Sequence, residues 1–144
     1  MDVPAVASKD PTTKGDGMDK VVHFEIPVDD EARAKEVYGS VFEWELNDVD
    51  MGGGATYTTA TTAPVDDRMM PTTPGAINGG MMKRTADQSS PIITISVDGI
   101  DDALKKIEAG GGSTITPRTP IPGMGAYAYF KDSEGNTMGL WETR

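Results

Sequence analysis

Residues 21–28 have the sequence Val-Val-His-Phe-Glu-Ile-Pro-Val, in which one set of alternate positions is wholly apolar. A β-strand directs alternate side chains to opposite faces, so this pattern predicts a strand with one buried face. The apolar face consists of Val22, Phe24, Ile26 and Val28, and the opposite face carries His23 and Glu25.

A helix is predicted directly after this strand. Asp29 and Asp30 are residue types that cap helix N-termini, and the apolar residues that follow have helical spacing. They form a stripe expected to pack on the sheet, made of Ala34, Val37, Tyr38, Val41 and Phe42.

The same order of elements recurs 69 residues later, where Phe24 is superposed on Ile93, and the strand is again followed by a helix. Asp98 is the expected cap of this second helix, and residues 110–112, three glycines, predict its end. The apolar stripe of the second helix consists of Ile100, Ala103, Leu104 and Ile107.

Three short extended segments follow each helix, at residues 44–47, 55–60 and 77–83, and at residues 114–116, 126–131 and 137–141. Residues 132–136 form a turn between the last two, and residues 61–75 and 117–125 are expected to be long loops. The pattern predicts an α+β fold of two βαβββ modules, module one at about 18–84 and module two at about 90–144. Both lie in one ordered domain of residues 18–144, preceded by a disordered tail of residues 1–17.

Composition excludes several classes of function. The 144 residues contain 23 acidic and 13 basic side chains, a net charge of -10, which disfavours nucleic acid and anionic membranes as partners. The chain has no cysteine and one histidine, so disulfides and thiolate sites are excluded. Without an apolar span or a leader pattern we expect a cytoplasmic protein. The acidity is explained by a solvated surface, or by a cytoplasm of high salt as in halophilic organisms.

The duplicated unit resembles the vicinal oxygen chelate superfamily, which comprises glyoxalase, bleomycin-resistance and dioxygenase proteins, and in particular its lactoylglutathione-lyase-related, glyoxalase-like members. The resemblance spans residues 20–144 and depends on several short motifs in the expected order. These motifs are VHFEIP at 22–27, VFEW at 41–44, INGGMM at 77–82, TPIPGMG at 119–125, FKD at 130–132, GN at 135–136 and GLWE at 139–142.

The resemblance implies sheets that curve around a cavity, often with a divalent metal held by the first and last strands of each module. The ligand positions fall on His23, Ile92, Gly80 and Gly139, of which only His23 offers a donor. A shift in the alignment of the last strands would instead place Asn78 and Thr137 there, whose amide and hydroxyl oxygens are poor ligands. One imidazole holds a divalent ion poorly, so we expect no metal and no other cofactor. If a metal binds, the expected ligands are His23 with Glu25 or Glu142.

His23 and Glu25 are the candidate catalytic pair, because an imidazole beside a carboxylate in an apolar cavity can act as a general base. They are also candidate ligand-binding residues, and the alternative is that both only hydrogen-bond neighbouring strands. The other candidate ligand-binding residues, for which strand packing is the alternative, are Asn78, Thr94, Tyr127 and Tyr129, with Ser96 on the same strand face as Thr94.

These observations predict a glyoxalase-like protein that binds a small organic molecule in the cavity between the two modules and whose metal site is incomplete. One alternative is a metal-dependent lyase or isomerase of the lactoylglutathione lyase type. Another is a protein that sequesters an antibiotic, as bleomycin-resistance proteins do. The resemblance also implies a homodimer.

Overall fold

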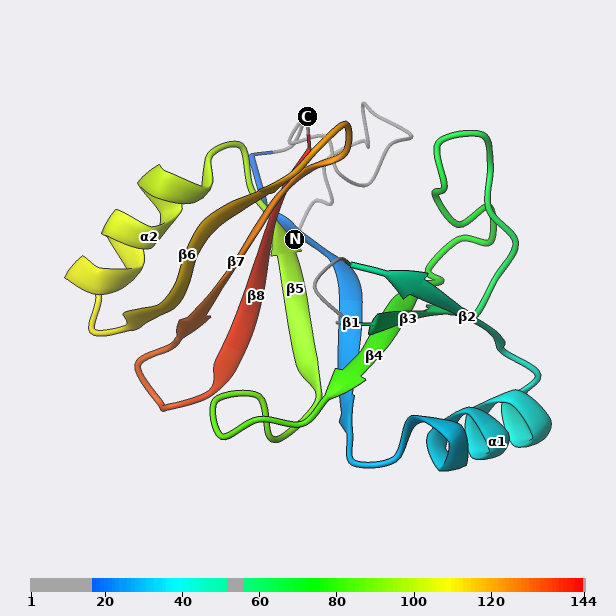
Figure 1. The fold of residues 1–144 in the computed structure, drawn as a ribbon. Coiled ribbons are helices and arrows are strands. Elements are labelled where there is room, and N and C mark those ends of the chain that lie inside the picture. The colour runs from blue at the N-terminus through cyan, green and yellow to red at the C-terminus, as the bar shows by residue number, and fades with distance from the viewer. Residues whose placement is uncertain (1–16, 52–55, 144) are drawn as a thin grey trace, which may run out of the picture. The chain divides into compact units, whose positions relative to one another are not determined.

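A computed structural model describes residues 17–51 and 56–143 and contains the two predicted βαβββ modules (Figure 1). Of the tail predicted at residues 1–17, only Gly17 lies within this part. The contacts divide the chain into two compact units, residues 23–92 and residues 93–144 with the segment up to Val22.

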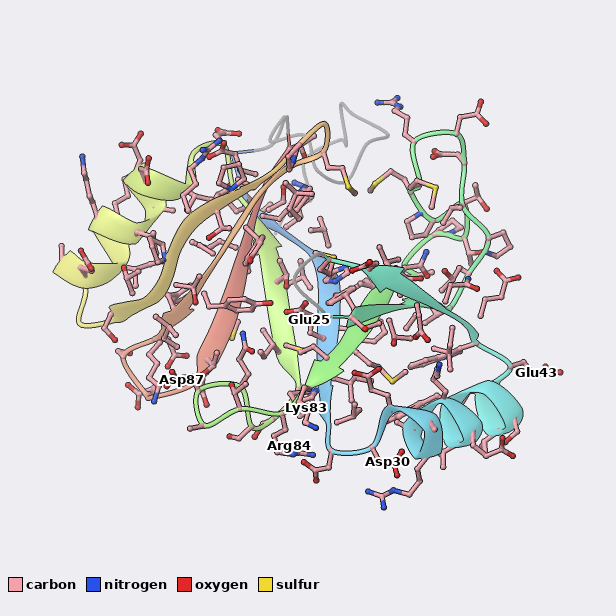
Figure 2. The ribbon with its side chains drawn as sticks, in the orientation of Figure 1. Glu25, Asp30, Glu43, Lys83, Arg84 and Asp87 are labelled. Carbon is pink, nitrogen blue, oxygen red and sulfur yellow. The ribbon has the colours of Figure 1, made fainter. Side chains whose placement is uncertain are left out.

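Module one consists of β1 (Lys20–Val28), α1 (Glu31–Phe42), β2 (Glu45–Asp50), β3 (Thr56–Thr61) and β4 (Gly79–Lys83). Its strands lie in the order β2-β3-β4-β1. β1 and β4 are parallel, whereas β3 is antiparallel to both β2 and β4. Arg84, labelled in Figure 2 at the end of β4, forms an ion pair with Asp29 beyond the end of β1, with 3.0 Å between Nε and Oδ1.

Module two consists of β5 (Ile92–Ser96), α2 (Ile100–Ala109), β6 (Ser113–Ile121), β7 (Gly125–Lys131) and β8 (Thr137–Thr143). Its strands lie in the order β5-β8-β7-β6, with β5 parallel to β8 and the other pairs antiparallel. The predicted turn at residues 132–136 is confirmed, since the Asp132 carboxylate accepts hydrogen bonds from the backbone N–H groups of Glu134 and Asn136.

The core of module two lies between α2 and one face of the sheet. Period-two alternation in β7 places its small and apolar residues on this face, and the apolar stripe of α2 covers them. The buried members of this core are Ile100, Leu104, Ala126, Ala128, Phe130 and Leu140.

Helix α1 of module one differs from the prediction, because none of its residues is buried. Its cap is as predicted, with Asp30 accepting a hydrogen bond from the backbone N–H of Arg33. The expected apolar stripe, however, leaves Val37, Val41 and Phe42 exposed by 47%, 64% and 56%. The helix instead contacts the sheet through aromatic rings, which include Tyr38 stacked on Trp44 at 5.1 Å and Phe24 at 5.6 Å from Trp44.

The N-terminus of α2 corrects a second prediction. Asp98 is not its cap, because Gly99 occupies the cap position and offers no side chain. The backbone N–H of Ile100 instead donates to Glu142 Oε1 at 2.9 Å. Glu142 also forms an ion pair with Arg118, with 2.7 Å between Oε2 and Nη2. One carboxylate on β8 therefore supplies the missing cap and joins α2 to β6.

The loop expected at residues 117–125 is also corrected, because residues 113–121 form strand β6 and only residues 122–124 connect it to β7. Pro117 and Pro120 are compatible with a strand here since β6 lies at the end of its module's strand order. The other loop stays largely irregular, with one isolated bridge between Val65 and Pro71.

Neither α1 nor α2 has the length and apolar character that crossing a bilayer requires, and no other helix occurs in the described residues.

We expect two substitutions of Glu142 to destabilise module two by different amounts. Glu142→Gln removes the ion pair, worth about 0.2–1 kcal/mol at a partly exposed site. Glu142→Ala also removes the cap of α2 and should cost about 1–2 kcal/mol in the free energy of unfolding. Urea unfolding at pH 7 measures both, with the exposed Glu36→Gln as control. Equal stabilities for Glu142→Ala and the control would contradict the capping role.

The same contact has a pH dependence. The hydrogen bonds from Arg118 and then from the Ile100 backbone lower the pKa of Glu142 below its ordinary 4.5. The stabilisation is therefore present above pH 4.5 and is lost as the pH falls through the lowered pKa.

Candidate functional site

The polar side chains predicted from the first strand lie on the face of module one opposite α1. Glu25 is paired in register with Gly80 of β4, and Gly80 is paired with Thr59 of β3. Residues in register share a face, and so do residues two apart on one strand. This face therefore carries His23, Glu25, Gly80 and, two residues before Thr59, Tyr57. Glu25, labelled on β1 in Figure 2, is only 6% exposed.

Tyr57 crosses strand β4 to reach His23. The strand order is β3-β4-β1, and His23 Nε2 lies 2.8 Å from the Tyr57 hydroxyl oxygen. The two rings are nearly parallel, with an interplanar angle of 18° and 6.5 Å between their centroids. The crossing is possible because residue 80 is glycine: a Cβ atom there would lie 2.1 Å from the Tyr57 hydroxyl oxygen. We name His23, Glu25 and Tyr57 the His23 cluster.

Burial decides the charge of His23. Loss of solvent around the ring lowers the pKa of His23 below its ordinary 6.5, and the nearby Glu25 carboxylate raises it by a smaller amount. The imidazole is therefore neutral at pH 7, with one nitrogen as donor and the other as acceptor. A neutral imidazole beside a phenol and a carboxylate can accept a proton or bind a polar group of a ligand.

Asn78, a predicted ligand-binding residue, holds the start of the long loop of module one. Its Oδ1 accepts hydrogen bonds from the backbone N–H groups of Thr62 at 2.7 Å and Ala63 at 3.1 Å. Its Nδ2 donates to the carbonyl oxygen of Ala63 at 3.4 Å. The structure thus gives Asn78 a structural role, and ligand binding by this residue stays a prediction.

The other predicted ligand-binding residues lie in module two. Ala126, Ala128 and Phe130 face α2, so Tyr127 and Tyr129 occupy the helix-free face of β7, where their rings are 5.8 Å apart. Thr94 on β5 is 6% exposed and is paired with Gly139. The structure brings these three together on one face of module two. Their contact with a ligand stays a prediction.

A shallow hollow of about 210 Å³ lies beside the β6–β7 hairpin, in the segment that the sequence predicted to be a long loop. Its charged groups are Arg118 and Glu142, which neutralise each other. The lining residues are Arg118, Pro120, Ile121, Pro122, Gly123, Gly125 and Glu142.

Comparison with known proteins identifies the family. Residues 20–140 match the family described as the Glyoxalase/Bleomycin resistance protein/Dioxygenase superfamily. The chain belongs to this superfamily. Two curated members, both named "Putative glyoxylase CFP32" and from Mycobacterium bovis and Mycobacterium tuberculosis, are 32% identical over 117 residues, which is 78% of this chain. The match covers 41% of those proteins, so the chain spans about two fifths of their length.

Solved structures of the superfamily share the fold at low sequence identity. The hypothetical protein BH1468 from Bacillus halodurans has a TM-score of 0.61 at 13% identity, over 88% of this chain and 95% of that one. Methylmalonyl-CoA epimerase from Streptomyces coelicolor has a TM-score of 0.60 at 13% identity, over 85% of this chain and 96% of that one. These similarities and the family match confirm the fold and the resemblance inferred from the motifs.

The donor set of this member does not fit the superfamily's divalent metal. Among residues 17–51 and 56–143, no three or more His, Cys, Asp or Glu side chains form a group that could hold a metal ion. Ile92, at the position equivalent to His23, is 1% exposed. The space beside the two glycines is occupied by other side chains. Tyr57 covers Gly80, and a Cβ atom at Gly139 would lie 2.7 Å from Thr94 Oγ1. Glu142 is engaged by Arg118 and the N-terminus of α2.

Tyr57 is the site residue that the sequence analysis missed. The alternation at residues 56–61 predicts a strand and places Tyr57 on one of its faces. The signal that identifies the partner is the Gly79-Gly80 pair, since a glycine within a strand indicates a close approach by another group.

We expect the pKa of His23 to lie below 6.5, and NMR titration of the ring Hε1 signal measures it without ambiguity because the chain has one histidine. Tyr57→Ala admits water to the ring and should raise the pKa towards 6.5. Glu25→Gln removes the negative charge that favours the protonated imidazole and should lower the pKa of His23 further. Tyr57→Phe, which keeps the ring covered, is the matched control. A wild-type midpoint at or above 6.5 would show that the ring is solvated.

The lowered pKa also predicts the pH dependence of stability. Between the folded pKa and 6.5 the unfolded chain binds more protons than the folded chain, so the free energy of unfolding falls as the pH falls through this window.

Proposed function

We propose that this chain is a glyoxalase-like protein that binds a small organic molecule on the helix-free face of module one, at the His23 cluster. The observation that carries the proposal is the 2.8 Å hydrogen bond between the only imidazole of the chain and Tyr57, beside a carboxylate that is 6% exposed. Strand packing alone does not require three polar side chains to meet on one face.

The chemistry of the cluster suits a ligand with polar oxygen atoms. A neutral imidazole offers a donor and an acceptor, and partial burial strengthens hydrogen bonds to a bound molecule. The same group can serve as a base for a proton next to a carbonyl. A curated relative is named a putative glyoxylase, and a protein of similar structure is named a methylmalonyl-CoA epimerase. Methylmalonyl-CoA, the thioester in the second name, carries carbonyl oxygens of this kind.

The metal-dependent lyase is a weaker candidate, because the donors around His23 do not fit a divalent ion. Capture of a cationic antibiotic is favoured by the net charge of -10 and by the buried Glu25 carboxylate, and it predicts binding that weakens strongly with added salt. The homodimer and the cytoplasmic location stay predictions.

Binding is tested by calorimetric titration with small hydroxycarbonyl compounds, their thioesters and one cationic drug, while the His23 Hε1 signal of the wild type reports whether a compound reaches the cluster. We expect at least one oxygen-bearing compound to shift the signal and to bind about tenfold more weakly, or worse, to His23→Ala, which corresponds to about 1.4 kcal/mol. Lys105→Ala, an exposed position on α2, is the matched control and should bind as the wild type does.

Two results would contradict the proposal. One is that no compound moves the His23 signal. The other is that ligands bind equally to the wild type and to His23→Ala. A cationic ligand whose binding is lost at high salt would favour the sequestering function instead.

A further inference from the structure

Tyr57 occupies the space that a side chain from the last strand of module one would otherwise fill. All three atoms nearest to a Cβ atom built on Gly80 belong to the Tyr57 phenol, at 2.1, 2.2 and 2.4 Å. Contacts below 3.0 Å are not tolerated, so any side chain at residue 80 and the present position of Tyr57 exclude each other. The glycine and the tyrosine are therefore one structural feature.

The feature is specific to module one. Gly139 holds the equivalent place in module two, but the atoms nearest to its built Cβ belong to Thr94 on the adjacent strand, and the closest lies at 2.7 Å. A threonine on the neighbouring strand covers a glycine without crossing another strand. Tyr57 crosses β4 completely and ends at His23. Both glycines are therefore covered by a neighbouring side chain. At Gly80 the covering phenol also makes a hydrogen bond with His23.

The phenol engages one of the two imidazole nitrogens through which His23 could hold a metal. His23 Nε2 is 2.8 Å from the Tyr57 hydroxyl oxygen, and cation binding through this nitrogen would break that hydrogen bond. A neutral phenol is a poor ligand for divalent ions compared with a carboxylate. The hydrogen bond also restrains the orientation of the imidazole, and the hydroxyl can donate to this nitrogen or accept from it according to the tautomer.

We propose that Tyr57, made possible by Gly80, replaces the metal ion in this site: it excludes a divalent cation and positions His23 to meet its ligand through hydrogen bonds. Tyr57 is thus a positioning residue. The inference rests on the proposed function only in placing the ligand at the His23 cluster, and a ligand held in this way needs one suitable oxygen and not a chelating pair.

A double-mutant cycle with metal ions alone tests the exclusion. Zn²⁺ is titrated into the wild type, Tyr57→Ala, Gly80→Glu and the double variant, with the His23 Hε1 signal and Co²⁺ absorption as readouts. We expect no site-specific binding by the wild type, weak binding by Tyr57→Ala, which has the space but not the third ligand, and an affinity of the double variant about 100-fold above that of Tyr57→Ala. Gly80→Glu alone displaces Tyr57 from its present position and should bind no more tightly than the double variant.

Three results would overturn the exclusion. The wild type binds one equivalent of ion at His23, Tyr57→Ala binds no more tightly than the wild type, or the folded double variant binds no more tightly than Tyr57→Ala. Because Gly80→Glu is the variant at risk of misfolding, Gly80→Ala serves as a second probe. It should expel Tyr57 and move the His23 pKa in the same direction as Tyr57→Ala does, and an unchanged pKa would also overturn the inference.

The positioning role is tested separately with Tyr57→Phe, which keeps the ring and removes the hydroxyl. We expect this variant still to exclude Zn²⁺ but to change the ¹⁵N shifts of the imidazole, which report the tautomer. Unchanged ¹⁵N shifts would contradict positioning by the hydroxyl. These titrations use no organic ligand, so they can fail while the proposed binding function holds, and the reverse is equally possible.

Discussion

Each module has a helix on one face of its sheet, and the period-two geometry of the strand assigns each residue either to that face or to the opposite one. In module two this places Ala126, Ala128 and Phe130 under α2 and leaves both tyrosines of β7 on the other side. In module one it sends Phe24 towards the aromatic residues beside α1 and His23 to the opposite face. The candidate site of module one lies on the face that does not pack against α1, where His23 and Tyr57 meet.

Local pattern was sufficient to predict the order of elements, the duplication and the face of His23, because alternation, caps and turns depend on neighbouring residues. It was not sufficient for contacts between distant residues. Tyr57 is 34 positions from His23, and the crossing requires the order β3-β4-β1, which spacing does not specify. The cap of α2 was assigned to Asp98 for the same reason, since Glu142 comes from a strand 42 positions away. Prolines led to a loop being predicted where an edge strand tolerates them.

The ligand positions of the superfamily show how one fold accommodates different chemistry. At residues 80 and 139, where the resemblance to the superfamily places donor side chains, this chain has glycine, and each glycine is covered by a different neighbour. Thr94 covers Gly139 and only packs against it, whereas Tyr57 covers Gly80 and brings a hydroxyl group to the imidazole of His23. Whether a glycine position stays inert or becomes part of a site therefore depends on the length of the side chain that covers it and on what that side chain reaches.

The lack of any buried residue in α1 has a consequence for how the molecule unfolds. Stability differs between regions of a protein according to how much apolar surface each buries, and weakly packed segments open without the rest. α1 is held by its Asp30 cap, its ring contacts and the 2.9 Å ion pair between Lys35 and Asp48, whereas α2 covers a continuous apolar core. The backbone amides of α1 should therefore exchange with deuterium long before those of α2, through fraying that leaves the sheet beneath intact.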